Sequence, residues 1–171
     1  MRVRVRVRVR VRVRVRVRVR VRVRGVWSDV PVHGDDQVDE GVSAELAALL
    51  RGAVDDRPVK ISSCVCGDCA GRVFSLRFDD VEGGAERECS GCGAQAFIAD
   101  SAEYWEEADP CVLECPCGSE EFEVAVAFTL SADGSVRWVT VGARCPEDGA
   151  PGVCADWKIN YIPTDHLLSM V

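Results

Sequence analysis

The feature that most constrains how this chain can fold is a cysteine-rich segment that occurs twice. Residues 89–100 read C-S-G-C-G-A-Q-A-F-I-A-D, and residues 145–156 read C-P-E-D-G-A-P-G-V-C-A-D. Five residues recur at a constant offset of 56 positions, and the second copy has Asp148 where the first has Cys92. A repeat within one chain indicates that a single structural unit is used twice.

A second cysteine pair precedes each copy, in C-V-C-G at 64–67 and in C-P-C-G at 115–118. Between the two pairs of each unit, residues 72–78 and 122–130 place apolar side chains at alternate positions, as strands with one buried face do. The dipeptide Asp133-Gly134 is a strong signal for the turn of a hairpin. Each unit is therefore predicted to be a cysteine pair, a β-hairpin and a second cysteine pair.

Residues 2–24 differ from the rest of the chain, because they alternate Arg and Val without exception and hold 12 of the 21 basic residues. We interpret this tract as translated simple-sequence DNA and exclude it from the fold prediction. The alternative is a cationic arm that binds anionic membranes, nucleic acid or the acidic remainder of the chain. The tract does not resemble a secretory signal, which needs an uninterrupted apolar region.

The predicted organisation has four parts: a low-complexity tract at 1–24, an acidic linker with a short helix at 25–58, a first cysteine-rich unit at 59–109 and a second at 110–171. The short helix is expected at 42–51, with Ser43 as its N-cap. Asp100 is expected to cap a further helical turn. Residues 157–162 are expected to form a closing strand.

Residues 25–171 contain 9 basic and 28 acidic residues, which gives this part of the chain a formal charge of −19. Such a charge repels the phosphate backbone of nucleic acids, whose binding depends on basic contacts, so nucleic acid is not the expected partner of these residues. A protein with a basic surface is attracted instead. No apolar run approaches the roughly 20 residues of a membrane-spanning helix, so we expect no membrane span.

Ten cysteines in a chain without a recognisable secretory signal indicate a reducing compartment, and we expect a cytoplasmic protein. In that setting, paired cysteines bind metal more often than they form disulfides. Zinc takes four thiolates in a tetrahedron, and two tight turns that face each other can supply them. Glycine after the last ligand suits the positive φ of such a turn. We therefore expect a zinc ion (Zn2+) in the first unit and consider a second ion in the second unit.

The ligands predicted for the first ion are Cys64, Cys66, Cys89 and Cys92. The pair Cys64 and Cys66 is preferred because it matches the C-P-C-G of the second unit and is followed by Gly67. The alternative replaces Cys64 with Cys69, since the C-x-x-C at 66–69 has the standard zinc spacing.

The ligands predicted for the second ion are Cys115, Cys117, Cys145 and Asp148. A carboxylate can complete a zinc site that has three thiolates. Two alternatives stay open. Cys154 or Cys111 takes the fourth position, or the second unit binds no metal and is held together by its hairpin core.

The pattern C-x-C-G, hairpin, C-x-x-C-G-A resembles the zinc-ribbon (zinc β-ribbon) class, and its tandem form is similar to small actinobacterial proteins with the same pattern. The resemblance covers roughly residues 59–168. It implies a small, β-rich α+β fold of two tandem zinc-ribbon units with short helices. In that pattern the second unit also ends in C-x-x-C-G, so Asp148 departs from it.

Catalytic motifs are not recognisable in the sequence. His33 and His166 stand apart from the cysteines, and neither H-E-x-x-H, H-x-E beside a cysteine pair nor a P-loop occurs. We therefore predict a zinc-binding, non-catalytic protein-interaction module with an acidic surface. The alternatives are a nucleic-acid-binding zinc ribbon and a zinc-dependent hydrolase. Tight nucleic-acid binding by residues 25–171 would favour the first alternative, and an open metal position beside a base would favour the second.

Overall fold

The computed structural model describes residues 36–54, 57–79, 81 and 83–171, and the Arg-Val tract lies outside them. Within these residues nine strands form one mixed sheet, accompanied by one α-helix, α1 (Ala44–Ala53), and two short 3-10 helices. No helix in this part of the chain has the length and apolar character needed to cross a membrane.

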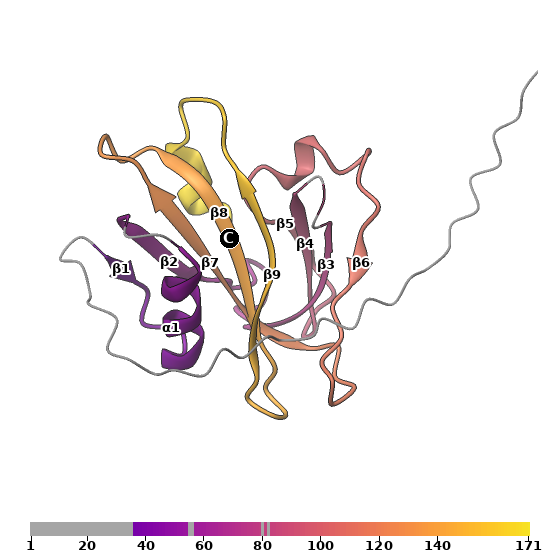
Figure 1. The fold of residues 1–171 in the computed structure, drawn as a ribbon. Coiled ribbons are helices and arrows are strands. Elements are labelled where there is room, and N and C mark those ends of the chain that lie inside the picture. Colours follow the sequence, from indigo (N-terminus) through magenta and orange to yellow (C-terminus); the bar gives the residue numbers. More distant parts are fainter. Residues whose placement is uncertain (1–35, 55–56, 80, 82) are drawn as a thin grey trace, which may run out of the picture.

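β7 is the strand on which the sheet is built. β7 (Phe122–Leu130), β8 (Val136–Arg144) and β9 (Pro151–Lys158) follow one another as antiparallel neighbours. On its other edge β7 pairs with β2 (Val59–Ser63), and β1 (Gln37–Val38) lies parallel to β2. Figure 1 shows the β7–β8 hairpin in the middle of the molecule, with α1, β1 and β2 to its left.

The remaining strands belong to a second hairpin. β3 (Val73–Asp79) and β4 (Gly84–Cys89) form this hairpin, and β5 (Gln95–Phe97) pairs with β4. β6 (Cys111–Val112) pairs with β3. β3 also pairs with β7 through the first two residues of each strand, so hydrogen bonding continues from one hairpin to the other. In Figure 1 these four strands lie to the right of the β7–β8 hairpin.

Alternate residues of β7 belong to two different cores, as the period of two in its sequence requires. Val124 and Val126 face the larger core, which contains side chains of β3, β4, β8 and β9. Ala125 faces a smaller core beneath α1, which contains Leu50. Gly142 of β8 permits the close approach of α1, because a Cβ at this position would lie 2.9 Å from Leu50 Cδ2.

The predicted short helix is present as α1. The Ser43 side chain accepts a hydrogen bond from the backbone N–H of Leu46 (3.4 Å), which is the N-cap role predicted for it. The helix runs two residues beyond the predicted end, to Ala53, and includes Gly52. Its apolar face covers the outer side of the sheet, so α1 is part of the main fold.

The predicted fold class, two tandem zinc ribbons with short helices, is wrong. Both predicted hairpins are present, but they form one nine-stranded sheet with only one α-helix among the described residues. The reason is an exchange of strands. β2 precedes the first hairpin and pairs with β7 of the second, while β6 precedes the second hairpin and pairs with β3 of the first.

Two local predictions are also wrong. One concerns the helical turn after Asp100, and the other concerns the closing strand. The helical turn after Asp100 is only a 3-10 turn at Ser101–Glu103, and Asp100 does not cap it. The buried Asp100 carboxylate instead accepts hydrogen bonds from Trp157 Nε1 (2.8 Å) and the Tyr161 hydroxyl (3.0 Å). The closing strand is β9, which begins six residues earlier than predicted and ends at Lys158.

Candidate metal centres

Four loops of the same backbone design stand at the ends of the two hairpins. In each loop, the carbonyl of the first cysteine accepts a hydrogen bond from an N–H near the end of the loop. The N–H of the same cysteine donates to the carbonyl of the residue that follows this donor, and both distances are 2.8 to 3.0 Å. We call these loops knuckles 1 to 4, and they comprise residues 66–71, 89–94, 115–119 and 145–150. Knuckle 3 is one residue shorter than the other three.

Each knuckle turns through a residue with positive φ. Gly93, Gly118 and Gly149 have φ values of 76°, 95° and 75° in knuckles 2, 3 and 4. In knuckle 1 the corresponding residue is Ala70, with a φ of 57°, whereas Gly67 is not in this conformation. The rule that glycine marks the turn therefore fails at knuckle 1, where alanine accepts the left-handed conformation at a cost of about 1–2 kcal/mol.

Knuckles 1 and 2 bring four sulfurs together. The Sγ atoms of Cys66, Cys69, Cys89 and Cys92 all lie within 4.8 Å of one another. Two of these pairs are 3.5 Å apart, Cys66 with Cys92 and Cys69 with Cys89. In a tetrahedron with zinc–sulfur distances of about 2.3 Å, the sulfurs are about 3.8 Å apart, so this group fits one zinc ion. The separations are far longer than a disulfide bond of about 2.05 Å, and all ten cysteines of the chain are free.

Cys64, predicted as a ligand, is not a member of this group, and Cys69 is. Cys64 lies two residues before knuckle 1, is 1% exposed and belongs to the larger core. Leu113 lies two residues before knuckle 3 and is also a buried residue of that core. Burial raises the pKa of Cys64 to about 12, so its thiol stays protonated at neutral pH.

The shortened knuckle 3 explains why the sequence pattern favoured Cys64 over Cys69. By their backbone hydrogen bonds, Cys66 corresponds to Cys115, and the second cysteine of knuckle 1, Cys69, corresponds to Cys117. The cysteines of the C-x-C-G motif therefore occupy different structural positions in the two units. The signal that identifies Cys69 is the C-x-x-C spacing at 66–69.

Knuckles 3 and 4 bring together the second predicted set. The sulfurs of Cys115, Cys117 and Cys145 and a carboxylate oxygen of Asp148 all lie within 4.8 Å of one another. Cys117 and Cys145 are 3.6 Å apart at Sγ, and Cys115 Sγ donates to Asp148 Oδ2 at 3.2 Å. Asp148 Oδ1 accepts a hydrogen bond from the Ala150 N–H (2.9 Å), which turns the other oxygen toward the sulfurs. This arrangement suits a carboxylate that binds through one oxygen.

Cys154 and Cys111, the alternative fourth ligands, belong to neither group. Cys154 Sγ donates to the Val141 carbonyl at 3.2 Å, and Cys111 Sγ donates to the Phe78 carbonyl at 3.5 Å. At the offset of 56 residues, Cys154 corresponds to Ile98, and both side chains are buried in the larger core. Cys154, like Cys64, occupies a core position that carries an aliphatic residue in the other unit.

The local electrostatics differ among the ligands of the first group. Hydrogen bonds from the N–H groups of Cys69 and Asp68 lower the pKa of Cys66 to about 7. The Ala94 N–H lowers the pKa of Cys92, but interactions with the Cys69 and Cys66 sulfurs outweigh it and raise the pKa to about 12. Four thiols this close resist ionising together, and a divalent cation removes that resistance because it favours the thiolate form of each ligand.

In the second group, too, the pKa of one ligand is raised and that of another is lowered. Burial raises the pKa of Cys115 to about 12. Hydrogen bonds from the Ala150 N–H and the Cys115 thiol lower the pKa of Asp148, so the carboxylate is ionised and able to bind a cation.

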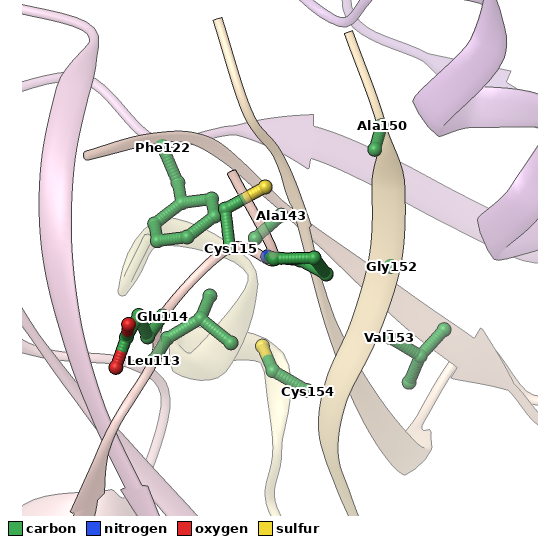
Figure 2. Close-up of a pocket in the computed structure, with 10 residues that line it drawn as sticks. Leu113, Glu114, Cys115, Phe122, Ala143, Ala150, Gly152, Val153 and Cys154 are labelled. Atoms are coloured by element: carbon green, nitrogen blue, oxygen red, sulfur yellow. The ribbon is translucent and has the colours of Figure 1, made fainter. Parts of the chain in front are cut away.

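A small, mostly apolar cavity borders Cys115 of the second group (Figure 2). Its volume is about 30 Å³, and its walls include Leu113, Cys115, Phe122, Ala143 and Cys154. Space of this size holds about one water molecule. The cavity is therefore too small for an organic substrate, and it matters here as free space beside Cys115.

Comparison of the chain with protein-family models, with curated proteins and with solved structures gives no match.

Proposed function

We propose that this chain is a zinc-binding, non-catalytic protein-interaction module in which each of the two groups holds one Zn2+. The observation that carries the proposal is the convergence of four ligand atoms within 4.8 Å at each pair of knuckles. Seven of the eight ligands are cysteines, and tetrahedral sites rich in thiolate select zinc among the common divalent ions.

The positions of the knuckles support a structural role for the ions. Knuckle 1 leads into β3 and knuckle 2 follows β4, while knuckle 3 leads into β7 and knuckle 4 follows β8. Each ion would therefore close the open end of one hairpin. Structural zinc sites contribute on the order of 10–16 kcal/mol in small peptides, which is comparable with the whole stability of a typical domain.

Saturated coordination favours binding over catalysis. Catalytic zinc keeps one position open for water or substrate, whereas structural zinc has four protein ligands. Both groups supply four ligands. The formal charge of −19 on residues 25–171 then favours a partner with a basic surface. A nucleic-acid-binding role is the weaker alternative, because phosphates are repelled by the same charge.

The metal content of the full chain tests the proposal. The protein is purified without added metal and examined by native mass spectrometry and elemental analysis, before and after treatment with a strong chelator. We expect two zinc ions per chain, and a loss of β-sheet circular dichroism when both are removed. A chain that keeps its fold without any bound metal would overturn the proposal.

The partner is tested by capture at low and high salt. The chain lacking residues 2–24 is the bait, because the Arg-Val tract would itself attract nucleic acid. We expect a basic protein to be retained at low salt and released as the salt concentration rises. Retention of nucleic acid by this bait would favour the alternative.

A further inference from the structure

We infer that the second group is an exchangeable zinc site, which releases and rebinds its ion while the ion of the first group stays in place. This inference rests on the proposed function and adds a regulatory property to one of the two sites. Both groups combine two buried and two exposed ligands, so access from solvent does not distinguish them. The distinction comes from ligand chemistry, packing and the strength of the surrounding sheet.

The ligand sets differ at one position. Asp148 stands where the first group has Cys92, so the second ion would be held by three thiolates and a carboxylate. Zinc binds thiolate more tightly than it binds a carboxylate oxygen, for which water is a close competitor. Asp148 and Cys92 are both exposed, so the difference at this position lies in the ligand atom, and the carboxylate oxygen is the ligand that an incoming molecule displaces more easily.

The sulfurs of the first group are packed closely by glycine backbone. A Cβ on Gly71 would lie 2.9 Å from Cys89 Sγ and 3.1 Å from Cys69 Sγ, and a Cβ on Gly91 would lie 3.5 Å from Cys69 Sγ. The corresponding residues of the second group are Ser119 and Glu147. Because both carry a Cβ, the backbone there cannot enclose the sulfurs as closely as glycine does at Gly71.

One ligand of the second group, Cys115, borders free space. Cys115 forms part of the wall of the cavity of about 30 Å³, opposite Cys154 and beside Phe122 (Figure 2). A side chain beside a space of this kind has fewer contacts with protein atoms on that side than a side chain enclosed by them. Cys115 can therefore shift when its ion leaves, at a smaller cost than a closely packed ligand would incur.

The sheet around the second group can hold its shape while the ion is absent. β7 and β8 have nine residues each and pair along almost their whole length, and β9 adds eight more residues. The first group relies on shorter strands, since β3, β4 and β5 have seven, six and three residues. Release from the second group is thus compatible with a folded chain.

The experiment follows zinc release from the full, zinc-loaded chain after addition of excess EDTA. Native mass spectrometry counts the ions, and pulse alkylation with N-ethylmaleimide followed by peptide mapping identifies the freed thiols. Loss of a hydrogen-bonding partner of a metal ligand typically costs about 10- to 100-fold in affinity, so a changed ligand should speed release at least about tenfold. We expect Cys115, Cys117 and Cys145 to be alkylated first.

Two buried cysteines outside both groups report on unfolding. Cys64 and Cys154 should stay unmodified while the second group empties, because the fold covers them. Their alkylation at the same rate as the second group would mean that the chain unfolds as a whole, which would overturn the inference.

Two exchanges of ligand complete the test. Asp148→Cys should slow release from the second group at least about tenfold, leaving only the difference due to packing, and Cys92→Asp should speed release from the first group by a similar factor. If Cys92→Asp does not fold, Asp148→Cys alone decides. Equal release from both groups, or a single ion bound only by the first group, overturns this inference and leaves zinc binding intact. A chain that binds no zinc overturns the proposed function as well.

Discussion

Cys69→Ala and Cys64→Ala form a matched pair of substitutions, because each removes one sulfur and the two positions are five residues apart. Cys69 belongs to the first group, whereas Cys64 is a core residue. We expect Cys69→Ala to lower the zinc content from two ions to one after dialysis against a chelator, and Cys64→Ala to leave both ions bound.

The effects on stability should differ in size. A structural site of four ligands contributes on the order of 10–16 kcal/mol, so one ligand in four accounts for about 2.5–4 kcal/mol while zinc still binds through the other three. Cys64 is 1% exposed, and deleting one buried atom of this size costs about 1 kcal/mol. Since each kcal/mol shifts Tm by about 2–4 °C at this chain length, we expect Tm at a saturating zinc concentration to fall by roughly 5–16 °C for Cys69→Ala and 2–4 °C for Cys64→Ala.

Both variants are measured together with Cys154→Ala, a second buried thiol outside the groups. Thermal unfolding is followed by circular dichroism at a fixed zinc concentration, and bound zinc is counted by native mass spectrometry. The reasoning is refuted if Cys64→Ala lowers the zinc content while Cys69→Ala does not, because that result would restore Cys64 as the ligand.

Three further predictions concern the fold. Ala70→Gly should stabilise the zinc-bound chain by about 0.5–1 kcal/mol in denaturant unfolding, since relief of the positive φ outweighs the added freedom of the unfolded chain; a loss of stability would contradict the strained turn. Gly142→Ala should destabilise by about 1–3 kcal/mol because its Cβ meets α1, whereas Gly52→Ala on the exposed side of α1 should stabilise by about 0.5–1 kcal/mol; equal effects would argue against the helix contact. Tyr161→Phe should cost about 1–3 kcal/mol, because buried Asp100 loses a donor. Burial, and then the Asp100 carboxylate, raise the pKa of Tyr161 above its usual value near 10. The stabilisation by the protonated Tyr161 hydroxyl is present below about pH 10 and is lost as the pH rises above 10. The difference in unfolding free energy between the native chain and Tyr161→Phe should therefore narrow above about pH 10, and a constant difference would contradict the role given to this hydrogen bond.

The local elements of the fold could be predicted because their signals are local. Alternation of apolar residues and the Asp133-Gly134 turn identified the hairpins, and Ser43 identified the start of α1. The pairing of β2 with β7 and of β6 with β3 joins strands far apart in sequence, and no residue pattern specifies such partners. The fold class failed at this step, because each unit was assumed to complete its own sheet.

The candidate sites were largely predictable because metal ligands need fixed spacing within tight turns. The internal repeat placed Asp148 at the position of Cys92, and the structure brings Asp148 next to three cysteines. The preference for Cys64, which the structure places outside the first group, arose from the position of a glycine. Gly67 follows a cysteine as the turn glycines of knuckles 2 and 3 do, but the residue with positive φ in knuckle 1 is Ala70. An alanine in the sequence does not indicate a positive φ. Asp100 was misread because a helix cap and a buried acceptor of hydrogen bonds use the same side chain.

X-ray absorption at the zinc K edge of the zinc-loaded full chain tests the central claim most directly. If each group holds one ion, the two ions together have seven sulfur ligands and one oxygen ligand. The spectrum should then show zinc–sulfur distances of about 2.3 Å with a small oxygen contribution at about 2.0–2.2 Å. A spectrum dominated by nitrogen or oxygen ligands would contradict the account.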